Sequence, residues 1–300
     1  MFTPQGVFVA MMTPFSQEGC LDEGTLRKLV DFLVEKGVHG LFPASSVGES
    51  PLLTLEERVR LMEIVTEQAN GRVPVTPGVG STHPAHSIHL AKEAKRVGCQ
   101  AVVVAPPYFY KVSEEMMERY FHAIADASEL PLIIYNIPVF TQPMSPRLVG
   151  SLSLRENVVG IKDSSGSMVE FVHFMDEVAR VGGELSFMIG REDMLFPALV
   201  MGARGCMVAT ACALPEAVVA IYKAWEVNDW ERARRIQMAI VPFIRACFSL
   251  PFPAGFKLAM ECRGFPMGPS RQPLSSAEEK RREVLRGELQ RLTRSILDAL

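Results

Sequence analysis

Residues 101–138 read AVVVAPPYFYKVSEEMMERYFHAIADASELPLIIYNIP, and this stretch decides the fold. Two apolar runs, 101–107 and 130–138, flank an amphipathic segment at 113–128. The runs are rich in Val and Ile and lack strict polar alternation, which is typical of strands buried on both faces. A helix between two such strands predicts a parallel strand–helix–strand unit, because parallel strands need a long crossover.

The same alternation continues in both directions along the chain. Apolar runs begin at Val7, Val38, Val73, Ala101, Leu130, Val158, Leu185 and Gly205. Eight such units predict an α/β fold, a (β/α)₈ TIM barrel, with a helix at 54–69 that begins in a capping box of Thr54 and Glu57. An open, doubly wound sheet is the alternative, but the chain has neither a G-x-G-x-x-G motif nor a P-loop.

The strand pattern stops after Trp225. Segments 229–248, 253–264 and 276–300 each predict a helix, and Pro and Gly residues separate them. We therefore expect a barrel over residues 1–225, carrying the active site, and a C-terminal helical region over residues 226–300.

Composition narrows the class of protein. The chain is 48% hydrophobic and 22% charged with a net charge of −3, so no basic face suggests nucleic acid. No apolar run reaches the roughly 18 to 20 residues of a membrane span, and the N-terminus has no basic leader that would indicate a signal peptide. Six scattered cysteines without a C-x-x-C pair favour reduced thiols and a cytoplasmic protein.

In a barrel of this kind the active site lies at the C-terminal ends of the strands. Lys162 is the only lysine inside any of the eight runs. Burial favours the neutral amine, which is the form that attacks a ketone to give an imine. Strand alternation places Ser164 on the same interior face and turns Asp163 outward. The alternative is a structural lysine paired with an interior carboxylate.

Hydroxyl groups follow neighbouring strands. Tyr135 ends the fifth run, beside Lys162, where a phenol can move protons during imine formation. Tyr108 and Ser46 follow the fourth and second runs and can relay a proton, and the amides of Ser46 and Val47 form a turn suited to a small carboxylate. A packed tyrosine and an ordinary turn are the alternatives.

At these residues the chain resembles a known family. The segments SSVGES (45–50), PPY (106–108), YNIP (135–138), GIKDSSG (160–166) and GRED (190–193), with the helical tail, are similar to the dihydrodipicolinate synthase and N-acetylneuraminate lyase superfamily of pyruvate-dependent class I aldolases. The resemblance covers nearly the full length. It implies Lys162 as the imine lysine, Tyr135 as the proton shuttle, Ser46 and Tyr108 as the relay, and Ser46 with the Val47 amide as the carboxylate seat.

The resemblance also implies an enzyme that needs no cofactor and no metal. It implies a homotetramer, a dimer of dimers, with Tyr108 close to a subunit boundary. The partners implied are pyruvate and a small aldehyde or sugar acid.

Departures from the family pattern concern the second substrate. Phe140 stands where the synthase has an arginine for the carboxylate of aspartate semialdehyde, and no other arginine is evidently placed to replace it. Val47 stands where the synthase usually has threonine. The segment KVSEEMMERYF (111–121) and the sequence KDS (162–164) look closest to those of 2-keto-3-deoxygluconate-type aldolases.

In the sugar-acid branches, acidic residues after the glycine of the GRED segment bind hydroxyls. Glu192 and Asp193 match them here, and Ser164 matches a hydroxyl that faces the substrate. The alternative is that both acids merely stabilise a helix N-terminus. The candidate substrate-binding residues are Val47, Phe140, Ser164, Gly190, Glu192, Asp193 and Met207.

The expected reaction is reversible cleavage of a 2-keto-3-deoxy sugar acid to pyruvate and an aldehyde. Alternatives through the same imine are dihydrodipicolinate synthase, a hydroxy-oxoglutarate aldolase and a sugar-acid dehydratase. A barrel that senses pyruvate without turnover is a further alternative. A metal-dependent aldolase would draw on His83, His86 and His89, but their spacing spreads them about 120° around a helix, which favours a surface stripe.

Overall fold

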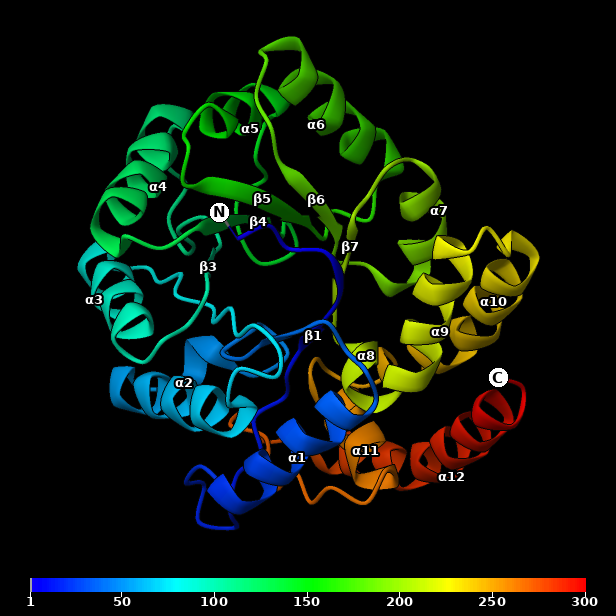
Figure 1. Ribbon diagram of the computed structural model, residues 1–300. Coiled ribbons are helices and arrows are strands. Elements are labelled where there is room, and N and C mark those ends of the chain that lie inside the picture. Colours follow the sequence, from blue (N-terminus) through cyan, green and yellow to red (C-terminus); the bar gives the residue numbers. More distant parts are fainter. Residues whose placement is uncertain (1) are drawn as a thin grey trace.

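A parallel sheet that curls into a barrel forms the centre of the computed structural model, which describes residues 2–300 (Figure 1). Within those residues the sheet has seven strands, β1 (Gly6–Ala10), β2 (Gly40–Phe42), β3 (Val102–Val104), β4 (Leu132–Asn136), β5 (Val158–Asp163), β6 (Ser186–Ile189) and β7 (Gly205–Val208). Their order is β2-β1-β7-β6-β5-β4-β3, and every neighbouring pair is parallel. All strand residues are buried, as their apolar sequences predict.

The run at 73–79 was expected to be a strand, and that expectation was wrong in detail. It makes only isolated parallel bridges, Leu41 with Val75 and Gly78 with Val103, so it fills the place between β2 and β3 without a continuous ladder. Pro74 and Pro77 explain the interruption, because each accepts a bond through its carbonyl but has no N–H to donate. The barrel therefore has eight units, one of which is irregular.

Helices surround the sheet in Figure 1. The outer layer contains α1 (Glu23–Glu35), α2 (Leu55–Ala69), α3 (Pro84–Arg96), α4 (Glu114–Ser128), α5 (Pro146–Ser153), α6 (Met168–Arg180), α7 (Leu195–Val200) and α9 (Pro215–Glu226). Short helical turns are η1 (Ser50–Leu52), η2 (Glu192–Met194) and α8 (Thr210–Ala213). The capping box predicted for α2 is confirmed: the Glu57 amide donates to Thr54 Oγ1 and the Thr54 amide donates to the Glu57 carboxylate.

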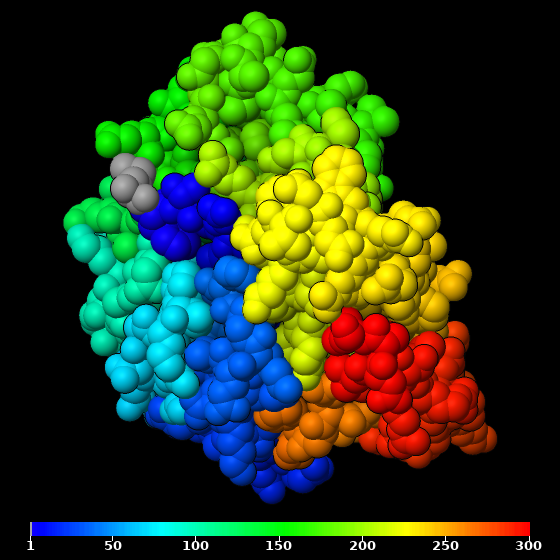
Figure 2. All heavy atoms as spheres, turned by 45° about the vertical axis from the view of Figure 1, so that its right-hand side comes forward, coloured from blue at the N-terminus to red at the C-terminus, as the bar shows by residue number. Residues whose placement is uncertain are grey.

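The three helices predicted after the barrel are confirmed as α10 (Trp230–Cys247), α11 (Ala254–Cys262) and α12 (Ser276–Asp298). They pack on one side of the barrel, and Figure 2 shows the last helix lying against the segment that contains α9 and α10. Within residues 2–300, no helix is both long and apolar enough to cross a membrane.

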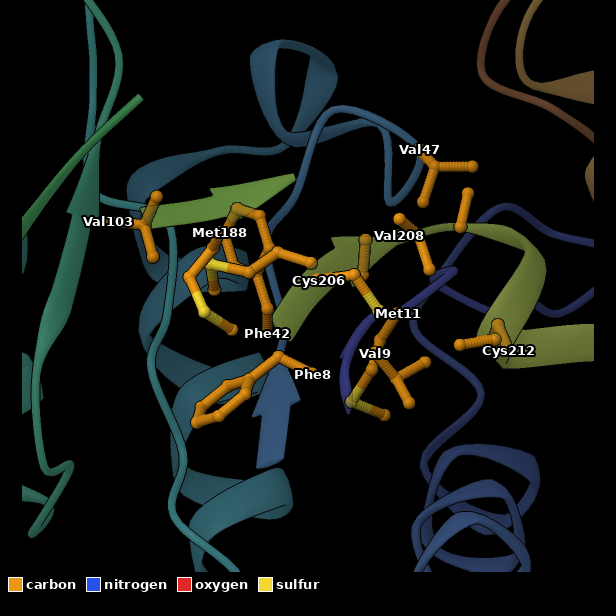
Figure 3. Close-up of a cluster of buried hydrophobic side chains, with 14 of the residues drawn as sticks. Phe8, Val9, Met11, Phe42, Val47, Val103, Met188, Cys206, Val208 and Cys212 are labelled. Atoms are coloured by element: carbon orange, nitrogen blue, oxygen red, sulfur yellow. The ribbon is translucent and has the colours of Figure 1, made fainter. Parts of the chain in front are cut away.

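Large apolar side chains fill the inside of the barrel beneath the strand ends. Phe8 on β1, Phe42 on β2 and Met188 on β6 lie together in Figure 3 and are at most 1% exposed. Lys162 is paired in register with Met188, so its side chain enters the top of this apolar interior.

Candidate active site

Lys162 lies in the interior at the end of β5, beside Tyr135 on β4, and the two residues are register partners. Both are buried, with Lys162 3% exposed and Tyr135 6% exposed. Lys162 Nζ lies 4.1 Å from the centroid of the Tyr135 ring and 4.9 Å from that of Phe42. No salt bridge found within residues 2–300 includes Lys162, so its amine faces two aromatic rings without a carboxylate partner.

The residues next to this pair hold the two strand ends together. Asp163 points away from Lys162, as alternation predicted, and accepts hydrogen bonds from Asn136 Nδ2 at 2.7 Å and Ser165 Oγ at 2.8 Å. Burial raises the pKa of Asp163, although these hydrogen bonds lower it. Asn136 Oδ1 accepts from the Met144 amide. This network fixes the backbone from which Tyr135 and Lys162 project.

Gly190 closes the interior beside Lys162 and Ser164. A Cβ atom at Gly190 would lie 2.8 Å from Lys162 Cε and would overlap Ser164 Oγ. The Gly190 amide donates to the Asp163 carbonyl at 2.7 Å. The structure thus brings Ser164 and Gly190 to Lys162, as the sequence predicted, and a side chain at 190 would displace the amine.

Ser46 reaches Tyr135 from the turn after β2. Their hydroxyl oxygens are 3.4 Å apart. The turn is held from below, because Thr13 Oγ1 donates to the Gly48 carbonyl at 2.7 Å and the Gly48 amide donates to Ser45. Within residues 2–300, neither the Ser46 amide nor the Val47 amide donates to a backbone carbonyl. Two free amides and one hydroxyl are suited to bind a carboxylate.

Tyr108 lines the same cavity but is not joined to the pair. No hydrogen bond from Tyr108 to Ser46 or Tyr135 occurs within residues 2–300. The next residue, Phe109, has a left-handed φ of 83°, and Phe109 and Tyr110 are 86% and 78% exposed. Sequence reasoning missed these two aromatic residues, although the PPYFY segment itself was noticed.

A cavity of about 330 Å³ with a mostly apolar wall lies beside Tyr135 and Phe42, the two rings that Lys162 Nζ faces. Lys162 itself, Val47, Ser164 and Gly190 are not among its lining residues. Phe140 forms part of that wall, with its ring 5.6 Å from the ring of Phe252. The position expected to lack a charged group therefore presents an aromatic surface. Polar groups in the wall come from Ser45, Ser46, Glu49, Ser50, Arg58, Tyr108, Tyr135, Thr141 and Gln272.

Arg58 is the polar wall residue that sequence reasoning missed. It projects from α2 and is 4% exposed. Arg58 Nη2 donates to the carbonyls of Gly78 at 2.7 Å and Gly80 at 3.2 Å, and burial lowers the pKa of its guanidinium to about 10. The sequence showed no arginine evidently placed to replace the one absent at position 140, and the structure puts Arg58 in the cavity wall from a different element, bonded to two backbone carbonyls. Inside an amphipathic helix pattern, nothing distinguishes such an arginine from a surface one.

Glu192 and Asp193 were expected to face the substrate, but in the structure their carboxylates bind other groups of the chain. The buried Glu192 carboxylate accepts from the amides of Ala209 at 2.9 Å and Thr210 at 3.0 Å, where α8 begins. Asp193 pairs with Arg191 at 3.0 Å. Neither acid lines the cavity, and neither does Met207, which is fully buried on β7. Because the Glu192 carboxylate accepts hydrogen bonds from backbone amides at the start of a helix, its contacts fit the alternative, in which it stabilises a helix N-terminus, better than a role in binding substrate.

His83, His86 and His89, the candidate metal ligands, do not form a metal-binding cluster within residues 2–300. His83 Nδ1 accepts from the Ala85 amide at the start of α3, and its ring stacks on His86 with centroids 4.5 Å apart. Within residues 2–300, no group of three His, Cys, Asp or Glu side chains is arranged to hold a metal ion.

Comparison with known proteins gives consistent matches over nearly the whole chain. The profile of the family described as the dihydrodipicolinate synthetase family matches residues 3–292. A 4-hydroxy-tetrahydrodipicolinate synthase of Methanopyrus kandleri is 36% identical over 97% of this chain and 97% of its own length. The synthase of Pelobacter propionicus is 34% identical over 94% and 96%.

Solved structures agree with this result. The chain is similar to YagE, a prophage protein of the dihydrodipicolinic acid synthase family from E. coli K12 in complex with pyruvate, with a TM-score of 0.89 and 32% identity over 96% of this chain and 98% of that one. Dihydrodipicolinate synthase from Aquifex aeolicus gives a TM-score of 0.90 and 30% identity over 96% and 98%.

Proposed function

Because the chain belongs to the dihydrodipicolinate synthetase family, we propose that Lys162 forms an imine with pyruvate and that this imine drives an aldol reaction with a small aldehyde. Members of the family are class I pyruvate-dependent lyases that form a lysine Schiff base, and this chain is an enzyme of that class. The observation that carries the assignment to Lys162 is its unpaired, buried amine against Tyr135.

The neighbouring hydroxyls support a proton path. The neutral amine attacks the C2 carbonyl of pyruvate, and the carbinolamine loses water to give the imine. The Tyr135 phenol supplies a proton to the departing oxygen, and Ser46, 3.4 Å away, can return one. Loss of a proton from C3 then gives an enamine, whose C3 attacks the aldehyde carbonyl while that oxygen takes up a proton. In cleavage the C3–C4 bond breaks, its electrons pass into the imine to give the enamine, and the aldehyde leaves as its hydroxyl loses a proton.

The turn after β2 has the hydrogen-bond donors needed to bind the pyruvate carboxylate. The amides of Ser46 and Val47, which donate to no backbone carbonyl within residues 2–300, and the Ser46 hydroxyl provide three donors in a turn whose Ser46 lines the cavity. A carboxylate held there keeps the ketone carbon near Lys162, which lowers the barrier through orientation.

For the second substrate, the proposal is cleavage of a 2-keto-3-deoxy sugar acid that yields a neutral hydroxyaldehyde. Phe140 in place of a charged group supports this, as does the Ser164 hydroxyl beside Lys162 and Gly190. Glu192 and Asp193 add no support, because backbone amides and Arg191 occupy their carboxylates.

Synthase activity is the second candidate, and one observation favours it. Arg58 lies in the cavity wall and can hold the carboxylate of aspartate semialdehyde. The relatives described above as 4-hydroxy-tetrahydrodipicolinate synthases align with this chain over nearly the whole length of both.

The experiment compares kcat/KM for glyceraldehyde and aspartate semialdehyde at saturating pyruvate, in the native chain and in Arg58→Met. The sugar-acid proposal expects glyceraldehyde to be preferred and pyruvate to be released from 2-keto-3-deoxy acids. A preference for aspartate semialdehyde that Arg58→Met abolishes would establish the synthase instead.

We further propose a homotetramer with the segment after Tyr108 at a subunit boundary. The exposed rings of Phe109 and Tyr110, beside the cavity, support a contact there. Light scattering should give a mass near four chains, and a monomeric mass would contradict this assembly.

A further inference from the structure

A buried ion pair joins the turn that carries Ser46 to the C-terminal helices. Lys257 on α11 donates to Glu49 Oε1 at 2.9 Å, and the two side chains are 3% and 2% exposed. The Arg271 amide donates to the other oxygen, Oε2, at 2.7 Å. Both oxygens of one carboxylate are thus held by a segment more than 200 residues away in sequence.

The other partners of Lys257 come from the C-terminal region and from the start of the chain. Its Nζ donates to the Pro269 carbonyl at 3.0 Å and lies 4.5 Å from the centroid of the Phe15 ring. The Arg271 guanidinium covers the same ring at 4.6 Å. The lysine therefore cannot move toward solvent without breaking several contacts, and it provides a fixed anchor for Glu49.

The backbone of Glu49 shows that the anchor acts on the turn. Glu49 has φ 59° and ψ 29°, a left-handed conformation that costs a non-glycine residue free energy and persists only where the surroundings impose it. Its amide donates to the Ser46 carbonyl at 3.1 Å, and Glu49 itself lines the cavity with Ser46. The conformation of Glu49 and the position of Ser46 are thus coupled through one short turn.

The turn is consequently held from two sides. Thr13 and Ser45 hold Gly48 from the barrel, and Lys257 with Arg271 holds Glu49 from the C-terminal segment. Backbone hydrogen bonds inside the turn, from the Glu49 amide to the Ser46 carbonyl and from the Ser50 amide to the Ser45 carbonyl, join Glu49 to Ser46. Within residues 2–300, the hydrogen bonds to the Glu49 side chain all come from Lys257 and the Arg271 amide.

We infer that Glu49 is a positioning residue, which the C-terminal segment uses through Lys257 to hold the Ser46–Val47 turn in the geometry that binds the carboxylate of pyruvate. This inference rests on the proposed function of that turn. It gives the helical region after the barrel an indirect part in catalysis, because Lys257 acts on the turn through Glu49 and touches no reacting atom.

The test uses Glu49→Gln, which keeps the size of the side chain and one acceptor but removes the charge. We expect the KM for pyruvate to rise by on the order of tenfold or more, as for loss of a hydrogen bond to a charged group. The KM for the aldehyde should change less than twofold. The matched control is Glu57→Gln, which breaks the partly exposed Arg271–Glu57 pair in the same region and should leave the KM for pyruvate within twofold.

A double variant, Glu49→Gln with Lys257→Met, separates positioning from stability. Replacing both partners of a buried pair leaves no unpaired charge and can restore stability. Positioning predicts that the double variant regains its melting temperature while the KM for pyruvate stays high. Recovery of the native KM together with stability would show a purely structural pair and overturn the inference.

Borohydride trapping distinguishes this inference from the function on which it rests. The native chain should trap a pyruvate adduct, and Glu49→Gln should trap the same adduct only at higher pyruvate concentration. If the native chain forms the adduct and Glu49→Gln forms it with an unchanged concentration dependence, the positioning role fails alone. If the native chain forms no adduct, the proposed function fails and the inference with it.

Discussion

Two lysines are equally buried in this molecule, each 3% exposed, and their surroundings differ in one respect. Lys257 in the C-terminal helices meets the Glu49 carboxylate at 2.9 Å and a backbone carbonyl at 3.0 Å. Lys162 in the barrel meets the rings of Tyr135 and Phe42 and no carboxylate within residues 2–300. The ion pair gives Lys257 a structural role, whereas no ion pair within residues 2–300 holds the amine of Lys162, which leaves it free to act as a nucleophile.

The comparison answers the question that the sequence left open about Lys162. A structural lysine paired with an interior carboxylate does exist in this chain, but it is Lys257. Burial lowers the pKa of Lys257, and the nearby carboxylates, chiefly that of Glu49, oppose that shift. The following predictions test whether the two lysines differ in role as their neighbours indicate.

The largest expected effect is on turnover in Lys162→Met. Without the amine no imine can form, so kcat should fall by about 10⁴-fold or more. Because the replaced amine had no ionic partner, the free energy of unfolding should not decrease by more than about 1 kcal/mol. Steady-state kinetics and denaturant unfolding measure the two quantities. A variant with substantial residual turnover would assign the nucleophile to another residue.

Tyr135→Phe should have the next largest effect. The ring against Lys162 is kept and only the hydroxyl 3.4 Å from Ser46 is lost. We expect pyruvate still to bind and kcat to fall by about 10²- to 10⁴-fold, the usual contribution of a positioned acid–base group. Native kcat in this variant would make Tyr135 a packing residue, and the proton path would then lie elsewhere.

Lys257→Met should act mainly on stability, in contrast with Lys162→Met. It leaves the Glu49 carboxylate buried without its cation, which typically costs about 3–5 kcal/mol. Urea unfolding followed by circular dichroism measures the loss. An unfolding free energy equal to that of the native chain would mean that Glu49 finds another donor, and the contrast between the two lysines would lose its basis.

The smallest effect is expected for Glu57→Gln. Its ion pair with Arg271 is partly exposed, at 22% and 27% of the two side chains, and such pairs contribute about 1 kcal/mol or less. The capping acceptor for the Thr54 amide is kept by glutamine. If Glu57→Gln lowered the free energy of unfolding as much as Lys257→Met, the buried Lys257–Glu49 pair would contribute no more to stability than the partly exposed Arg271–Glu57 pair.

The parts that could be predicted from sequence depend on short-range pattern. Continuous apolar runs rich in Val and Ile predicted the strands. The two-residue period of a strand then predicted that Lys162 and Ser164 face the interior and that Asp163 faces outward. Neighbouring strand ends placed Tyr135 beside Lys162. The irregular unit at 73–79 was also accessible in principle, because Pro74 and Pro77 are visible in the sequence and a proline cannot donate to a ladder.

The parts that could not be predicted depend on contacts between distant segments. Glu49 and Lys257 are separated by 208 positions, and no periodicity connects them. Arg58 looks like any charged residue of an amphipathic helix until the fold turns it onto Gly78 and Gly80. The family resemblance predicted Glu192 as a substrate ligand. Its actual partners, the Ala209 and Thr210 amides, are brought to it only when the chain folds.

The most direct test of the difference between the two lysines is peptide mapping by mass spectrometry after treatment with pyruvate and borohydride. The account predicts one reduced pyruvate adduct per chain, located on Lys162, with Lys257 unmodified and with no adduct in Lys162→Met. An adduct on any other residue, or an adduct that persists in Lys162→Met, would contradict it.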